Sequence, residues 1–137
     1  MGTVREKITL RNVIDVGVAK RGFMAEDKIR VAAVTALVDT GSAMLVINED
    51  MRNQLGLDIK KKYIATLADG SLQECGITES VEIEWENRST EGPALVLPDA
   101  DEILLGAIPL EGMDVMVDVK SRRLVGIHGD TQIMTIK

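Results

Sequence analysis

Aromatic residues are almost absent from this sequence, which has one Phe, one Trp and one Tyr among its 137 residues. The core must therefore consist of Val, Ile, Leu and Met, and the chain offers few rings on which nucleic-acid bases stack. Basic residues are in the minority, and the formal net charge is −6. Because phosphate contacts need clustered cations, we expect no nucleic-acid partner. The basic runs Lys60–Lys62 and Arg122–Arg123 are expected to be solvated surface.

Cysteine and histidine occur once each, as Cys75 and His128. A single cysteine excludes an internal disulfide and a cysteine-rich metal site, and a single histidine excludes a multi-histidine zinc site. We therefore expect no metal and no cofactor. Cys75 is expected to be a small buried apolar residue, and His128 a surface or interface residue rather than a catalytic one.

Long hydrophobic runs are also missing. No stretch approaches the roughly 20 apolar residues that cross a bilayer, and the N-terminal residues lack the apolar core of a signal peptide. We therefore expect a cytoplasmic protein with no membrane partner. The length suits one domain over residues 1–137, large enough for its own core.

The hydrophobic pattern is mainly that of strands. Alternation over residues 12–19 predicts a half-buried strand, and the Val-rich run 29–38 predicts a strand covered on both faces. A turn is expected over residues 86–92. Further short strands are expected at 43–47, 93–98, 102–106, 114–119, 123–127 and 131–137. Many short strands separated by turns are typical of an all-β sandwich or barrel.

Two local signals stand out among these strands. Asn48 can cap a helix that Gly56 ends, so residues 48–56 are expected to be helical. Asp69-Gly70 lies between two strand-like runs and predicts a long hairpin over residues 61–86. Its outgoing strand alternates, with Val81, Ile83 and Trp85 facing inward. A single helical turn is expected at residues 108–113.

A carboxylate follows the most apolar of these strands, in the sequence LVDTGS (37–42). Taken alone, Asp39 is explained by a tight turn or a helix cap. The residues that follow Asp39 also suit a binding or catalytic role. Gly41 allows a ligand or another chain to approach the backbone closely, and the hydroxyls of Thr40 and Ser42 can reach nearby carboxylates.

Three segments together carry a family resemblance: LVDTGS (37–42), YIATLADGSLQECG (63–76) and ILLG (103–106). Asp-Thr-Gly-Ser after an apolar strand, combined with a distant aliphatic-aliphatic-Gly, is much more specific than Asp-Thr-Gly alone. On these residues the chain resembles the retropepsin-like aspartic proteases, and most closely the bacterial single-domain members. The resemblance covers about residues 10–127.

The resemblance implies an all-β fold, a closed barrel of the acid-protease type with one lobe per chain, a flap hairpin and one or two short helices. It also implies an aspartic endopeptidase that acts on peptide or protein substrates. In that family two aspartates share one proton, and the pair activates a water that attacks the peptide carbonyl. This sequence holds only one Asp-Thr-Gly, so the expected enzyme is a two-fold homodimer with one Asp39 from each chain.

By the same resemblance, Asp39 is the catalytic residue and Thr40 links the two active-site turns. Gly41 lies beneath the substrate, and Ser42 hydrogen-bonds the outer oxygen of Asp39. Residues about 1–10 and 130–137 are expected at the dimer interface. Two groups of residues complete the expected site: the flap tip of Ala68, Asp69, Gly70 and Ser71, and the supporting strand of Leu104, Leu105 and Gly106.

The sequence also departs from the family pattern. Retroviral members carry acidic residues just after the catalytic turn and an Arg after the aliphatic-aliphatic-Gly, where this chain has Ala43, Met44 and Ala107. Two other function classes therefore remain open. One is a dimerisation or regulatory module of the same fold with little or no proteolysis, and the other is a β-barrel binding domain with a coincidental turn.

Overall fold

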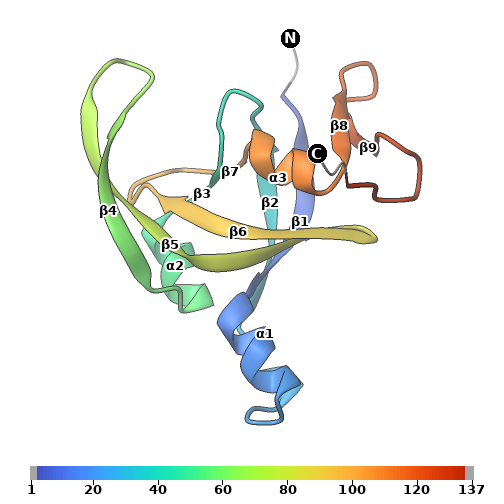
Figure 1. Ribbon diagram of the computed structural model, residues 1–137. Coiled ribbons are helices and arrows are strands. Elements are labelled where there is room, and N and C mark those ends of the chain that lie inside the picture. Colours follow the sequence, from blue (N-terminus) through green and yellow to red (C-terminus); the bar gives the residue numbers. More distant parts are fainter. Residues whose placement is uncertain (1–2, 135–137) are drawn as a thin grey trace.

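The computed structural model describes residues 3–134, which are mostly β with three short α-helices (Figure 1). Sequence reasoning allowed one or two helices, so the described chain has at least one more than expected. The helices are α1 (Val13–Lys20), α2 (Glu49–Leu55) and α3 (Ala107–Gly112), with a short 3₁₀ turn η1 (Glu26–Lys28). The strands are β1 (Arg5–Asn12), β2 (Val31–Val38), β3 (Leu45–Ile47), β4 (Ile59–Thr66), β5 (Leu72–Trp85), β6 (Arg88–Val96), β7 (Ile103–Leu105), β8 (Val115–Asp118) and β9 (Arg123–Gly126).

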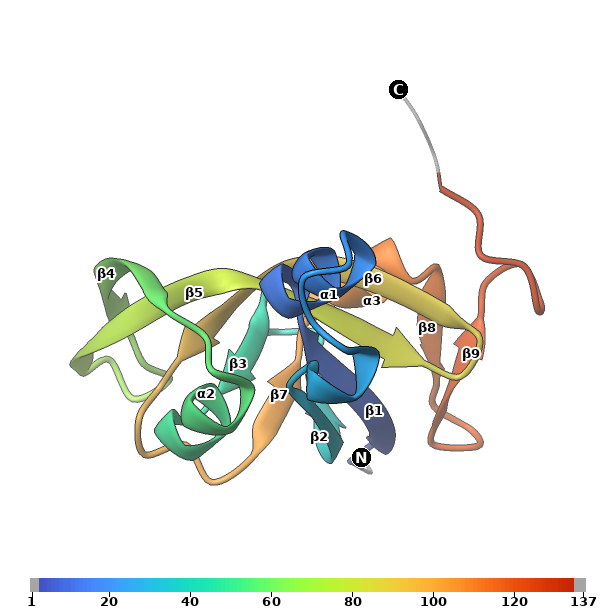
Figure 2. The same ribbon diagram turned by 90° about the horizontal axis from the view of Figure 1, so that it is seen from below.

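Six of these strands close into a barrel, as the resemblance implied. The order is β1-β2-β7-β3-β6-β5, and a further pairing of β1 with β5 closes the ring. The β2–β7 and β3–β6 pairs are parallel, and the other pairs are antiparallel. Strand β4 extends the sheet beyond β5, and β8 and β9 form a separate hairpin beside the barrel (Figure 2).

The barrel interior is aliphatic, as the shortage of aromatic residues requires. Val81, Ile83 and Trp85 of β5 are all buried, which confirms the inward face predicted for that strand. Their partners include fully buried leucines and isoleucines from five other elements and loops, at Leu10, Leu45, Ile47, Leu55, Leu57 and Leu105. Burying each such side chain contributes about 2 kcal/mol, so this cluster is the main source of stability.

Helix α2 has the bounds and caps that the sequence predicts. The Asn48 side chain accepts a hydrogen bond from the Met51 backbone N–H at 2.8 Å. Gly56 ends the helix in the left-handed conformation, with φ of 63°. Both devices satisfy backbone groups that a helix end leaves without partners.

The strand predicted at residues 12–19 is wrong, because this segment is helix α1. Asn12 caps it by accepting from the Asp15 backbone N–H at 3.0 Å. The buried Asp15 carboxylate accepts three hydrogen bonds from Arg30, one from the backbone N–H and two from the guanidinium. These bonds hold the pKa of Asp15 below its usual value. The alternation of apolar residues was therefore misleading, since a partner 15 residues away decides which side of the segment is buried.

Three other expectations need correction. Strand β2 is covered on one face only, because Val31, Ala33 and Thr35 are exposed. The turn predicted over 86–92 is limited to Glu86-Asn87, since β6 already begins at Arg88. Arg88 is buried because its guanidinium donates to the carbonyls of Met113, Asp114 and Gly129.

The predicted terminal strand is absent from residues 131–134, and residues 135–137 lie outside the described part of the chain. The segment is held by side-chain contacts instead. Gln132 donates to the carbonyls of Ser89 and Gly112. Within residues 3–134, no helix is long and apolar enough to cross a membrane.

Candidate active site

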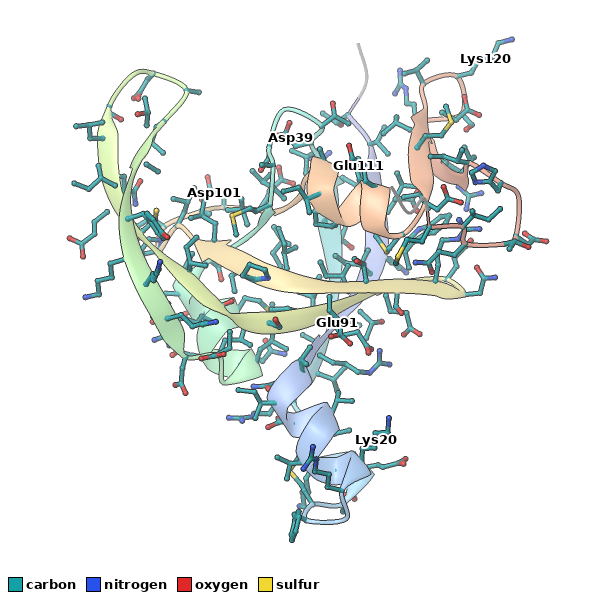
Figure 3. All side chains as sticks on the ribbon, in the orientation of Figure 1. Lys20, Asp39, Glu91, Asp101, Glu111 and Lys120 are labelled. Atoms are coloured by element: carbon teal, nitrogen blue, oxygen red, sulfur yellow. The ribbon has the colours of Figure 1, made fainter. Side chains whose placement is uncertain are left out.

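Asp39 follows directly on β2, at the point where β2 runs parallel to β7. Val38 pairs with Leu105, and the Asp39 backbone N–H donates to the Leu105 carbonyl at 3.0 Å. The motifs LVDTGS (37–42) and ILLG (103–106), which lie far apart in the sequence, are therefore neighbours in the fold. Figure 3 shows Asp39 on the loop between β2 and β3, near the start of α3.

Backbone hydrogen bonds fasten this loop to the segment after β7. The Ala107 N–H donates to the Ser42 carbonyl at 2.7 Å, and the Ile108 N–H donates to the Ala43 carbonyl at 2.9 Å. Within the loop, the Ser42 N–H donates to the Asp39 carbonyl at 3.0 Å. The turn that carries Asp39 is thus held by main-chain bonds on both of its sides.

Gly106 is required by this arrangement. A Cβ at this position would lie 2.4 Å from the Met44 carbonyl oxygen and 2.6 Å from that of Ser42. Both contacts are closer than real Cβ atoms come to backbone. Its neighbour Leu105 is fully buried in the core, and Leu104 is half-buried. The aliphatic-aliphatic-Gly motif is therefore explained by packing: a hydrophobic anchor, followed by a residue with no side chain where the loop crosses.

The Asp39 side chain is only half-buried, and Thr40 and Gly41 beside it are exposed. One carboxylate oxygen, Oδ1, accepts a hydrogen bond from the Gly41 backbone N–H at 3.0 Å. The Ser42 hydroxyl donates to the Met44 carbonyl at 3.2 Å. The expectation that Ser42 bonds the outer oxygen of Asp39 is therefore not met within this chain, since the hydroxyl is already used to hold its own loop.

An apolar hollow of about 430 Å³ adjoins Asp39. Sequence reasoning missed two of its residues, Val117 and Val119 at the end of the β8–β9 hairpin, and Val119 is 81% exposed. The sequence predicts a short strand over residues 114–119, but nothing local indicates that it ends beside Asp39. The other lining residues are Thr3, Val4, Leu37, Val38, Asp39 and Thr40.

The β4–β5 hairpin carries the second predicted group, and its tip lies at the same end of the molecule as the Asp39 loop (Figure 1). Ala68, Asp69, Gly70 and Ser71 are all exposed. Asp69 Oδ1 accepts from the Ser71 hydroxyl at 2.6 Å and from the Ser71 N–H at 2.9 Å, which lowers the pKa of Asp69. Gly70 adopts φ of 85°, a left-handed conformation that suits glycine.

The single cysteine and the single histidine lie in other contexts. Cys75 is buried on β5, as expected. His128 is about half-exposed and its Nδ1 lies 2.7 Å from Asp114 Oδ2, a contact that lowers the pKa of Asp114. Among residues 3–134, no three acidic, histidine or cysteine side chains gather as a metal site.

A comparison with known protein families matches the part of the chain that contains the Asp39 loop and Gly106. Residues 26–111 match the family described as "gag-polyprotein putative aspartyl protease". A comparison with curated proteins gives no match. One similar solved structure is the retroviral protease-like domain of Ddi1 from Leishmania major, with a TM-score of 0.51 and 19% identity. That alignment covers 69% of this chain and 78% of the other, and it shows a shared fold.

A second similar structure is the EIAV protease complexed with the inhibitor HBY-793. It has a TM-score of 0.46 and 27% identity, over 58% of this chain and 75% of that one. The family match spans more than half of the chain and includes Asp39, Asp69 and Gly106. This chain therefore belongs to the gag-polyprotein aspartyl protease family.

Proposed function

We propose that this protein is a homodimeric aspartic endopeptidase in which the Asp39 carboxylates of two chains form one active site. The observation that carries the proposal is the fastening of the Asp39 loop to Leu105 and Ala107 by main-chain hydrogen bonds. It leaves a half-buried carboxylate on a rigid turn whose outer residues, Thr40 and Gly41, are exposed. Membership of an aspartyl protease family supports the same assignment.

The chemistry follows from two carboxylates held too close for both to ionise. The ionised Asp39 removes a proton from a water, whose oxygen attacks the carbonyl carbon of the peptide. The protonated Asp39 gives its proton to the carbonyl oxygen, so a neutral tetrahedral diol forms. Transfer of a proton to the amide nitrogen lets the C–N bond break, and an acid and an amine leave. No metal or cofactor takes part in these steps.

A second copy of the chain is the proposed occupant of the hollow beside Asp39. The described chain has one Asp-Thr-Gly, whereas the mechanism needs two carboxylates. A two-fold contact through this hollow would bury the exposed Val119 and bring the two turns together. Burial of apolar surface at the contact provides the driving force.

We assign the remaining roles as follows. Thr40 links the two turns across the two-fold axis, and Gly41 presents its backbone to the substrate. The Asp69-Gly70 tip covers the bound peptide and gates its access. Residues about 1–10 and 130–137 add to the dimer interface of a single 1–137 domain, so deleting residues 130–137 raises the dimer dissociation constant. An unchanged dissociation constant would remove those residues from the interface.

The test is cleavage of a diverse peptide library between pH 4 and 7 by wild type and by Asp39→Asn at equal dimer concentration. Cleavage by wild type alone supports the proposal, and the products give the specificity. Equal cleavage by both proteins points to a contaminant or to another mechanism. A dimer that cleaves nothing would instead fit a regulatory module of the same fold. An Asp50→Asn variant, altered on the exposed face of α2, serves as the matched control.

A further inference from the structure

Strand β4 is an edge strand with a free side. It ends the seven-stranded sheet, and among residues 3–134 its only strand partner is β5. All of its residues except Ile59 and Ala65 are exposed. Backbone N–H and C=O groups on its outer side are therefore open to pairing with another extended chain. Figure 2 shows β4 at one side of the molecule, away from the β8–β9 hairpin.

This edge carries the densest positive charge of the chain. The pairing of β4 with β5 shifts register between Ile59 and Lys61. As a result, Lys60 and Lys61 border the same hollow of about 340 Å³, together with Ile77, Thr78, Ser80 and Pro93. That lining contains no acidic residue. Neither lysine forms an ion pair with any residue in the described part of the chain, whereas Lys62 lies 3.9 Å from Glu74.

Apolar side chains continue the edge toward the hairpin tip. Ile64 is 72% exposed and Tyr63 is 48% exposed. A strand that pairs with β4 would therefore meet lysines at one end and an aliphatic and an aromatic side chain further along. Lys60 and Lys61 border the same hollow, so a segment with its carboxylates along one face can meet both. Its apolar side chains then share the other face, because side chains of a strand alternate between its faces.

The charge of the edge also decides against a second copy of this chain as its partner. Parallel, in-register pairing of β4 with another β4, or antiparallel pairing centred on Lys61, would bring two Lys60–Lys62 runs together, and like charges on adjacent strands are destabilising. Lysines on edge strands commonly prevent such self-association. They do not repel an acidic chain, and at close range each ammonium attracts a carboxylate.

We propose that β4 is a docking edge for an extended acidic peptide segment. The segment adds to the sheet as one more strand on the free side of β4, and its carboxylates meet the side chains of Lys60 and Lys61. Main-chain hydrogen bonds supply affinity, and the lysines supply the preference for acidic partners. In a protease whose substrate passes under the same hairpin, this edge would hold an acidic stretch of the substrate away from the cleaved bond. That consequence rests on the proposed function, whereas the binding itself does not.

The test uses the full-length Asp39→Asn protein, so that no peptide is cut and binding is measured independently of activity. The probe is a six-residue peptide of alternating Glu and Val with blocked ends, and the comparison is its Lys and Val counterpart. Backbone amide signals are followed by NMR at 50 and 300 mM NaCl. We expect the Glu peptide alone to shift signals of residues 59–66, with weaker binding at the higher salt.

The Lys60→Glu/Lys61→Glu variant should weaken binding of the Glu peptide at least tenfold. An Arg122→Glu/Arg123→Glu variant makes the same charge change at the end of the β8–β9 turn and the start of β9, and it should leave binding unchanged. The proposal is overturned if the Glu peptide shifts no β4 signals, or if the Lys peptide binds equally well. It is also overturned if a single-stranded oligonucleotide binds the edge more tightly, or if β4 signals depend on protein concentration alone, which indicates self-pairing.

Discussion

Two turns built from the same kinds of residue lie at one end of this molecule, and they are held in opposite ways. The turn at Asp39 is bonded through its main chain to Leu105 of β7 and to Ala107 and Ile108 of α3. The turn at Asp69 is held by hydrogen bonds among its own residues, 67–71. Asp69 accepts two hydrogen bonds from Ser71, and Leu67 exchanges main-chain bonds with Gly70 and Ser71.

Under the proposed function, this difference would separate a fixed part of the site from a movable one. Displacing Asp39 breaks its main-chain bond to the buried Leu105, so under the proposed function the carboxylate would keep its place while a substrate binds. The hydrogen bonds of the Asp69 turn all lie within residues 67–71, so they would survive the movement of the hairpin tip that the proposed cover requires. Catalysis by a positioned carboxylate needs the first property, and a cover that admits substrate needs the second.

The largest expected effect is that of removing the carboxylate from the fixed turn. Asp39→Asn should lower kcat for peptide cleavage by about 10³-fold or more, because the amide cannot accept the proton of the attacking water. Asp69→Asn makes the same chemical change in the other turn and should lower kcat by less than about tenfold. Steady-state kinetics of both variants at equal dimer concentration measure the two values of kcat. A similar loss of kcat in Asp39→Asn and Asp69→Asn would contradict the different roles assigned to the two turns.

Crowding the fixed turn should destabilise the whole fold. In Gly106→Ala the new Cβ meets the carbonyls of Met44 and Ser42, so we expect a loss of about 3 kcal/mol in the free energy of unfolding. Gly92→Ala is the matched control, since a Cβ there has no neighbour within 4 Å. Urea denaturation of both variants measures the difference. Equal stability of the two would mean that the Asp39 loop is not fixed by Gly106.

A carboxylate remote from both turns should affect stability and leave cleavage unchanged. Asp15 is buried against Arg30, and its pKa is lowered. Asp15→Asn should lose about 2 kcal/mol at pH 7. Because the pKa of Asp15 is lower in the folded protein than in the unfolded chain, the ionised carboxylate stabilises the wild-type fold at any pH above the unfolded-state pKa of about 3.9. This contribution is lost as the pH falls through the pKa that Asp15 has in the folded protein. The difference in free energy of unfolding between wild type and Asp15→Asn, measured by urea denaturation, should therefore become smaller below about pH 5. A gap that is constant with pH would rule out the charged pair as its origin.

The smallest effect is expected at the tip of the movable turn. Gly70→Ala places a side chain at φ of 85°, with no neighbour within 4 Å, so the strain of about 1 kcal/mol stays local. The free energy of unfolding should change by no more than that amount, while KM shifts as the tip fits the substrate less well. Thermal denaturation and cleavage kinetics together check this. A loss as large as that of Gly106→Ala would show that the hairpin tip is as firmly fixed as the Asp39 turn.

Much of this arrangement could be predicted from short stretches of sequence. Asn48 and Gly56 set the ends of α2, because capping depends on residues within one or two turns of a helix. Val81, Ile83 and Trp85 are inside because alternation reports directly on the faces of a strand. The pairing of LVDTGS with ILLG came from the order of motifs in a family, and the β2–β7 register now gives it a physical basis.

Two of the errors, at Asp15 and Arg88, have a common physical origin in partners that lie far away in the sequence. The sequence pattern places Asp15 on one face of a strand, whereas in the structure it lies in helix α1 and is buried against Arg30. Arg88 looked like part of a turn because the carbonyls that bury it belong to residues 113–129. The expectation for Ser42 fails for a local reason, because its hydroxyl donates to the carbonyl of Met44 only two residues away. Composition and spacing report local preferences, whereas the side chains of Asp15 and Arg88 are placed by contacts between distant parts of the chain.

The central claim is that two chains each contribute one Asp39 to a single site, and mixing subunits tests it most directly. Wild type and Asp39→Asn are unfolded together, refolded at varied ratios, and assayed at constant total dimer concentration. If both carboxylates are needed, mixed dimers are inactive, and cleavage falls as the square of the wild-type fraction. A linear fall would show that one Asp39 is sufficient and would contradict the shared site.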